Sequence, residues 1–267
     1  MKGLAALTAE VARALRGLLF DLDDTLLSHG VLTRGAYDAL WDLKDAGLRL
    51  VAVTGRPSGW GEVIARQWPI DAAVTENGAV VVARESHGLA RSERCDETER
   101  RSRRIRLARL VEDVRAAVPE ARLTDDVEAR RSDVTWDIGE RVKLPEDRVA
   151  AIARVIAAAG ARSFASSVHI HATFDVDDKA TGTIAYLARA FGEDPGAATS
   201  ARWAFVGDSG NDAACFAAFW TTFAVANVRA HLARIPVTPR YLATRSMGEG
   251  FAEIAGAILA ARAGSKA

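Results

Sequence analysis

Short apolar runs alternate with helical periodicity along the first third of the chain. Residues 17–22 and 48–53 are short, nearly continuous apolar runs, which are typical of buried strands. Between them, apolar positions recur at helical spacing up to Gly47, a residue type common at helix ends. Further apolar runs at 72–74 and 79–83 continue the pattern. This alternation predicts a Rossmann-like α/β core, in which helices cover both faces of a mainly parallel sheet.

The pattern changes after residue 83 and returns at Lys179. In between, residues 134–138 and 168–174 alternate between apolar and polar positions, as strands with one buried face do. Two amphipathic helical stretches accompany them, so this part is predicted to be an inserted α+β module. The predicted boundaries are 1–83 and 175–267 for the core, and 84–174 for the insert.

Composition narrows the classes of protein that this chain can be. It has 267 residues, 49% of them apolar, and its 35 basic and 35 acidic residues balance. Such values exclude wholesale disorder, and the zero net charge argues against binding to nucleic acid or to an anionic membrane. Glu10 and Arg13 interrupt the N-terminal segment, which therefore lacks a signal-peptide core. We expect a cytoplasmic protein whose two cysteines, Cys95 and Cys215, are reduced.

Acidic residues gather where two of the predicted strands end. Ligands of open α/β sheets bind at the carboxyl ends of the strands. Asp21 and Asp23 are two residues apart, so an extended backbone directs both to one side. Asp208 and Asp212 follow a neighbouring strand and can converge on the same place. The negative charges of such a group of carboxylates repel one another and must be balanced by a cation. Mg²⁺, which prefers oxygen ligands, can provide the positive charge.

These residue types suit phosphoryl transfer. A carboxylate such as Asp21 can attack phosphorus, and a second one two residues later can protonate the leaving alcohol. The transferred phosphoryl group also needs donors on its oxygens, and Thr54 and Lys179 are suitable. Lys179 is one of only five lysines in the chain and opens a helix where the α/β pattern resumes.

The same residues resemble a known family. FDLDDTLL (20–27), VTGRP (53–57), Lys179 and GDSGND (207–212) resemble, in order, the four motifs of the haloacid dehalogenase superfamily. VTENGAVVV (74–82), followed by a long insert, resembles the subfamily with a C2-type cap, class IIB. Its members include Cof-like, sucrose-phosphate, trehalose-phosphate and mannosyl-phosphoglycerate phosphatases, and also phosphomannomutases. The resemblance implies that the insert is the cap that selects the substrate.

The resemblance also implies roles for individual residues. Asp24 stands where many relatives have glycine, but others have Asp there, so this departure leaves the chemistry undisturbed. The implied roles are nucleophile and Mg²⁺ ligand for Asp21, general acid/base and backbone-carbonyl ligand for Asp23, phosphoryl binding for Thr54 and Lys179, Mg²⁺ binding for Asp208 and Asp212, and lining of the phosphate pocket for Asn211.

Candidate substrate contacts come from both parts of the chain. On the core we predict Gly55, Arg56 and Asn77, although Asn77 and its neighbours can instead simply shape the turn into the insert. In the insert, His169 and His171 share one face of a strand. They either contact substrate or form an exposed polar face. A zinc site is not supported, because no cysteine or further histidine lies near them.

Other polar residues of the insert point less clearly to a function. Arg130, Arg131 and Asp137 are further candidates for substrate contact. Trp136 falls on the apolar phase of its strand and is predicted to lie in the core. The arginine-rich stretch 91–109 also contains acids, so we interpret it as a solvated helix face.

Together these observations predict a Mg²⁺-dependent phosphomonoesterase acting on a small phosphorylated metabolite, most simply a sugar phosphate. One alternative is a phosphomutase of the phosphomannomutase type, which shares the core chemistry. Another is a binding protein that kept the site but lost turnover. The sequence leaves the oligomeric state open.

Overall fold

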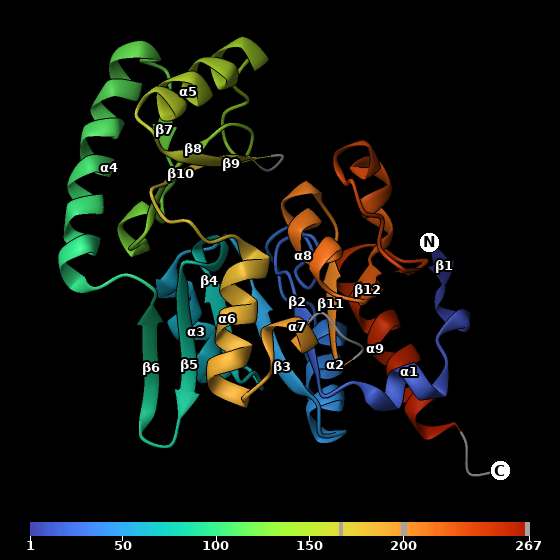
Figure 1. Cartoon of the computed structure of the whole chain (residues 1–267). Coiled ribbons are helices and arrows are strands. Elements are labelled where there is room, and N and C mark those ends of the chain that lie inside the picture. The colour runs from blue at the N-terminus through green and yellow to red at the C-terminus, as the bar shows by residue number, and fades with distance from the viewer. Residues whose placement is uncertain (166–167, 199–201, 265–267) are drawn as a thin grey trace.

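The computed structural model describes residues 1–165, 168–198 and 202–264. Within these residues the strands form two sheets, one of nine strands and one of four. Figure 1 shows the small sheet and its helices standing at one end of the large sheet and its helices. The predicted class, α/β with a mainly parallel sheet, is confirmed. None of the helices in the described part of the chain has the length and apolar character needed to cross a lipid bilayer.

The large sheet is parallel except for a hairpin at one edge. Parallel neighbours need a crossover, usually a helix, whereas the hairpin strands need only a turn. In spatial order the strands are β1 (Lys2–Gly3), β13 (Tyr241–Leu242), β12 (Thr221–Ala224), β11 (Trp203–Gly207), β2 (Gly17–Phe20), β3 (Arg49–Val53), β4 (Ala72–Thr75), β5 (Val80–Glu85) and β6 (Gly88–Glu93).

Helices cover both faces of the large sheet, which explains why its central strands are continuous apolar runs. Leu18 and Phe20 of β2 face one helix layer, and Leu19 faces the other. Figure 1 shows α6 and α8 on the near face, with α2 and α9 behind the sheet. The helices are α1 (Ala9–Ala14), α2 (Arg34–Asp45), α3 (Ser58–Gln67) and α9 (Met247–Ala263) on one side, and α6 (Lys179–Phe191) and α8 (Ala213–Ala218) on the other.

The small sheet has one apolar and one polar face. Trp136 and Ile170 pack against two helices and form a separate core, as the sequence pattern predicts for Trp136. On the other face, His171 and Thr173 are buried polar residues. The elements are α4 (Glu97–Ala117), η3 (Val127–Ala129) and α5 (Glu146–Ala158), with antiparallel strands in the order β7 (Arg122–Leu123), β8 (Asp133–Asp137), β10 (His169–Thr173) and β9 (Arg162–Ala165).

The hairpin β5–β6 belongs to the large sheet, and residue 84, where the insert is predicted to begin, lies within β5. The division into core and insert stays a prediction. The remaining short helices are η1 (Leu4–Ala6), η2 (Glu76–Gly78), α7 (Pro195–Ala198), η4 (Gly210–Asp212), η5 (Ala226–Ala230) and η6 (Leu232–Arg234).

The interpretation of the arginine-rich stretch as a solvated helix face is wrong for part of α4. Arg100 is only 3% exposed, and its Nη1 donates to Asp175 Oδ2 at 2.6 Å. Arg103 reaches the same carboxylate, and Glu93 accepts from Arg100 on its other side. The chain leaving β10 crosses this face of α4, so ion pairs replace solvent there.

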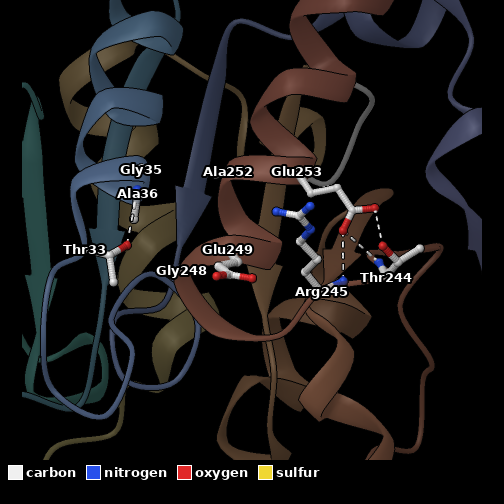
Figure 2. A pocket seen from close by; sticks show the side chains of 9 residues that line it. All are labelled: Thr33, Gly35, Ala36, Thr244, Arg245, Gly248, Glu249, Ala252 and Glu253. Carbon is white, nitrogen blue, oxygen red and sulfur yellow. Dashed lines mark hydrogen bonds between the residues drawn. The ribbon is translucent and has the colours of Figure 1, made fainter.

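A cavity of about 680 Å³ lies where α2 and α9 begin (Figure 2). The Glu253 carboxylate closes the loop before α9, accepting from the amides of Thr244 and Arg245 at 2.9 Å each. Thr33 caps α2 by accepting from the amide of Ala36. The cavity is therefore a gap between two helix starts, and none of the predicted site residues lines it.

Two glycines allow α6 to approach the turn after β4. A Cβ on Gly182 would lie 2.2 Å from the carbonyl oxygen of Gly78. We expect Gly182→Ala to lower the free energy of unfolding by about 1–3 kcal/mol, because backbone would have to move. Gly256→Ala on α9 is the matched control, since nothing lies within 4 Å of its Cβ. Replacing this exposed helical glycine should be neutral or stabilising by up to about 1 kcal/mol. Urea unfolding measures both, and equal effects would contradict the close approach.

Candidate active site

Three buried carboxylates meet at the carboxyl ends of the central strands. Asp21 follows β2, Asp208 follows the neighbouring β11, and Asp212 ends the short helix η4. One carboxylate oxygen from each lies within 4.8 Å of the others. The motif that contains Asp21 and the motif that contains Asp208 and Asp212 are far apart in sequence, and the fold brings these three acids together.

A single lysine lies between two of these acids. Lys179 is 1% exposed, and its Nζ donates to Asp21 Oδ1 and to Asp212 Oδ1, both at 2.8 Å. Lys179 is the first residue of α6, and the Asp178 side chain caps that helix by accepting from the amides of Ala180 and Thr181. The cap fixes where the helix starts and hence where the ammonium group lies.

One ammonium does not balance three carboxylates, and the pKa values show the imbalance. Burial and the neighbouring acid Asp212 raise the pKa of Asp21 to about 7, although Lys179 opposes the shift. The same two causes raise the pKa of Asp208 to about 8. Burial alone would lower the pKa of Lys179, but its two carboxylate partners outweigh burial and raise it. The cluster therefore carries an excess of negative charge that a bound cation would balance.

The donor set fits a hard divalent cation. All the candidate ligand atoms are carboxylate oxygens, and no cysteine is among them. Oxygen ligands of this kind suit Mg²⁺ or Ca²⁺, whereas zinc sites usually include nitrogen or sulfur. Asp21, Asp208 and Asp212 could therefore hold a metal ion.

Asp23, the predicted acid/base, lies beside this cluster and not in it. Its side chain is 46% exposed, and Arg56 binds it with two nitrogens, the shorter contact being 2.6 Å from Nη2 to Oδ1. The guanidinium group also stacks on Trp60, 4.2 Å from the ring centre. Arg56, predicted as a substrate contact, is therefore engaged with Asp23 in this structure.

Thr54, Gly55 and Arg56 follow β3 at the same edge of the sheet at which Asp21 follows β2. Thr54 is buried, and its Oγ1 accepts from the amide of Arg56 at 3.1 Å. Gly55 packs against Asn77, whose side-chain oxygen would lie 3.2 Å from a Cβ at residue 55. Gly55 and Arg56 line the cavity that opens at the acids, whereas Thr54 and Asn77 are not part of its lining.

Two residues that the sequence reasoning missed hold Asp208 in place. Thr25 Oγ1 donates to Asp208 Oδ1 at 3.2 Å, and Asn227 Nδ2 donates to Asp208 Oδ2 at 2.8 Å. Asn227 also donates to the carbonyl of Asp24 and accepts from the amide of Met247. Its position just after β12 is a signal that could have found it, because ligands gather at strand ends.

Asp21 and Asp208 open into a cavity of about 550 Å³, which is lined by loops at the strand ends of the large sheet and by residues of the small sheet. His169 and His171 of β10 take part, so the face they share is turned toward the acids. Arg130 takes part too, and its Nη1 donates to the carbonyl of Gly55 at 3.0 Å. The cavity lining also includes Asp21, Asp23, Gly55, Arg56, Asp126, Glu140, Asp208, Asn211 and Asn227.

Ion pairs organise the polar face of the small sheet. His171 Nδ1 lies 2.9 Å from Asp133 Oδ2 and 2.9 Å from Thr135 Oγ1. Asp133 also accepts from Arg130 at 3.1 Å. Burial lowers the pKa of His171, although Asp133 opposes this. His169 has a different partner, the Glu140 carboxylate at 2.8 Å from its Nε2.

Glu76 ties the small sheet to the large one. Its buried carboxylate accepts from the amides of Ser58, Arg131 and Ser132, at 2.9, 3.0 and 2.6 Å. Burial and the nearby Asp133 raise the pKa of Glu76. Glu76 and Asn77 both have left-handed backbone, with φ of 50° and 54°. The turn at Glu76 and Asn77 is therefore hydrogen-bonded directly to Arg131 and Ser132, which lie in the predicted insert.

Titration of the acids predicts how stability depends on pH without metal. An aspartate in the unfolded chain ionises near pH 3.9. Because the pKa of Asp208 is raised to about 8, the folded protein keeps a proton that the unfolded chain has lost, so its contribution to the free energy of unfolding falls as pH rises toward 8. We expect Asp208→Asn to flatten the decline measured by urea unfolding in EDTA, while Asp45→Asn on exposed α2 leaves it unchanged. Equal slopes in all three proteins would contradict the shift.

Comparisons with known proteins agree with this site. Residues 18–99 match the family model of haloacid dehalogenase-like hydrolases. No curated protein matches the chain. A Thermoplasma acidophilum protein superposes with a TM-score of 0.71 at 16% identity, over 92% of this chain and 98% of its own.

Two phosphatases are among the similar solved structures. Sucrose-phosphatase from Synechocystis, solved with sucrose and phosphate, has a TM-score of 0.63 at 16% identity, covering 91% of this chain and 98% of its own. A phosphatase of the haloalkanoate (HAD) enzyme superfamily from Bacteroides thetaiotaomicron has a TM-score of 0.61 at 17% identity, covering 94% and 97%. Each of these likenesses covers more than nine tenths of this chain. With the match over residues 18–99, they confirm the chain's resemblance to the haloacid dehalogenase-like hydrolases that its four motifs indicate.

Proposed function

We propose that this protein is a Mg²⁺-dependent phosphomonoesterase that hydrolyses a small phosphorylated metabolite, with a sugar phosphate as the preferred class. One observation carries the proposal: a buried carboxylate, Asp21, shares Lys179 with Asp212 and opens into a cavity lined by loops of the large sheet and by strand β10 of the small one. The similarity to phosphatases agrees with it. A purely binding site has no need of a buried acid cluster with one lysine.

The metal site would consist of Asp21, Asp208 and Asp212, joined by the backbone carbonyl of Asp23. When bound, Mg²⁺ supplies positive charge that lowers the repulsion between the phosphate and the acids. Thr25 and Asn227 hold the Asp208 carboxylate, so this metal-binding group is already oriented before a metal ion binds.

In the first half of the reaction, a carboxylate oxygen of Asp21 attacks phosphorus. A bond forms between that oxygen and phosphorus as the ester P–O bond breaks, which gives an aspartyl-phosphate and frees the alcohol. Asp23 donates the proton that the leaving oxygen needs. Lys179 and Thr54 stabilise the charge on the phosphoryl oxygens.

In the second half, Asp23, now a carboxylate, takes a proton from water. The water oxygen attacks phosphorus, the bond to Asp21 breaks, and inorganic phosphate leaves. The active site then has its starting protons again.

The contact between Arg56 and Asp23 adds a requirement to the proposed reaction. Asp23 accepts from Arg56 through both oxygens, so it is arranged as a carboxylate, ready for the second half. To donate a proton in the first half, it must leave Arg56. Oxygen atoms of the bound substrate are competing acceptors, and Trp60 keeps the guanidinium near them.

The polar lining of the cavity favours a polyhydroxyl leaving group. His169, His171 and Glu140 offer both donors and acceptors, and no Phe, Tyr or Trp lines the described part of the cavity. A sugar satisfies such groups by hydrogen bonding. The cytoplasmic location predicted from the sequence stays a prediction.

The mechanism predicts that Asp21→Asn removes turnover. With the nucleophile gone, phosphate release from sugar phosphates and from an aryl phosphate should fall by about a thousandfold or more in the presence of Mg²⁺. Asp45→Asn, an exposed position on α2, is the control and should retain full activity. EDTA should stop release by the wild-type protein.

The outcomes separate the alternatives. Full activity in a folded Asp21→Asn protein would exclude Asp21 as the nucleophile. Isomerisation of a sugar phosphate without phosphate release would identify a phosphomutase. Mg²⁺ binding with no turnover on any compound would favour a binding protein.

Substrate contact through the small sheet predicts a selective defect. His171→Gln should raise KM for a sugar phosphate about tenfold, because a buried hydrogen-bonding group is lost. It should change KM for a small aryl phosphate much less, since the core alone binds the phosphate. His87→Gln, in the exposed turn between β5 and β6, is the control. Equal changes for both substrates would argue that His171 only supports the fold.

A further inference from the structure

A second cavity of about 570 Å³ lies between the first turn of α3, strand β6, helix α4 and η3. We call it the arginine cleft, because six arginines and three glutamates line it. It shares one lining residue, Arg130, with the cavity above the acids. No step of the proposed reaction uses it.

Two of its arginines carry charge that no carboxylate balances. Among the described residues, the ion pairs of the α4 arginines do not include Arg101 or Arg104, although Arg104 donates to the carbonyl of Arg130 at 2.7 Å. Both lie on the cleft-facing side of α4, about one turn apart. The other four arginines are paired: Arg91 with Glu62, Arg100 with Glu93 and Asp175, Arg130 with Asp126 and Asp133, and Arg131 with Glu93 and Glu97.

The start of helix α3 adds no free positive charge to the cleft. Ser58 and Gly59 of its first turn are part of the lining, but the amide of Ser58 already donates to the Glu76 carboxylate at 2.9 Å. The attraction for an anion therefore comes from the side chains of α4. Of the three lining glutamates, only Glu128 has no ion pair in the described structure, so it is the lining carboxylate that opposes an anion.

We propose that the arginine cleft binds a small phosphorylated compound with two or more negative charges. Guanidinium groups suit phosphate because their planar N–H forks match its oxygens. Arg101 and Arg104 bind the anion from α4. This site is separate from catalysis and does not depend on the proposed function.

The location gives the cleft a connection to the candidate active site. Arg130 lines both cavities and contacts Gly55, while the next two residues bind Glu76 through their amides. A ligand in the cleft therefore lies against the segment that joins the small sheet to the loops around the acids.

Calorimetric titration with inorganic pyrophosphate tests the proposal. EDTA keeps divalent ions out, so the uncompensated acid cluster repels the probe and leaves the cleft as the favoured site. We expect one site per chain and binding about tenfold weaker in the Arg101→Gln/Arg104→Gln protein, because charge-assisted hydrogen bonds are lost. Arg109→Gln, exposed on the same helix, should bind like the wild type. Glu128→Gln should bind more tightly, because the opposing charge is gone.

The outcomes are decisive because these exposed positions can change without loss of the fold. Absence of saturable binding to the wild-type protein would overturn the proposal. So would equal affinity in the Arg101→Gln/Arg104→Gln protein, or the same loss in the Arg109→Gln control. The last result would show that overall charge attracts pyrophosphate and that the cleft does not.

Discussion

The burial of three carboxylates around one lysine is the constraint on which the rest of this structure depends. Asp21, Asp208 and Asp212 come from separate parts of the chain, and Lys179 bonds to two of them. Holding like charges this close without water costs free energy. The apolar strands β2 and β11 supply the rigid framework that fixes Asp21 and Asp208 side by side.

The imbalance of charge has a chemical use. A carboxylate nucleophile is most effective when it is poorly solvated and held in place, and burial provides both for Asp21. The same burial raises its pKa, so a cation is needed to keep it ionised. The buried acids thus link stability, metal binding and reactivity, and a change in one of them changes the other two.

The core of this site could be predicted from the sequence because it follows local rules. Asp21, Thr54 and Asp208 each end an apolar strand, and parallel strands bring their ends together. Asn227 also lies near a strand end, but its role depends on contacts with Asp24 and Asp208, which are far away in sequence. The burial of Arg100 could not be predicted, because its partner Asp175 lies far away in sequence. The division of the arginine cleft from the catalytic cavity likewise depends on contacts between distant segments, which no local pattern contains.

The left-handed turn at Glu76 and Asn77 has a further consequence. Residues other than glycine pay roughly 1–2 kcal/mol each for this backbone conformation. The bonds that offset the cost reach Arg131 and Ser132, on the other side of the junction between the sheets. The turn and the junction are therefore one cooperative unit: if the small sheet swings away, the turn loses its partners and relaxes. Asn77 packs against Gly55, so that relaxation would reach the loop carrying Thr54. Opening of the cavity at the acids and loosening of the loop after β3 would then be a single event, which in the proposed reaction would couple product release to disassembly of the site.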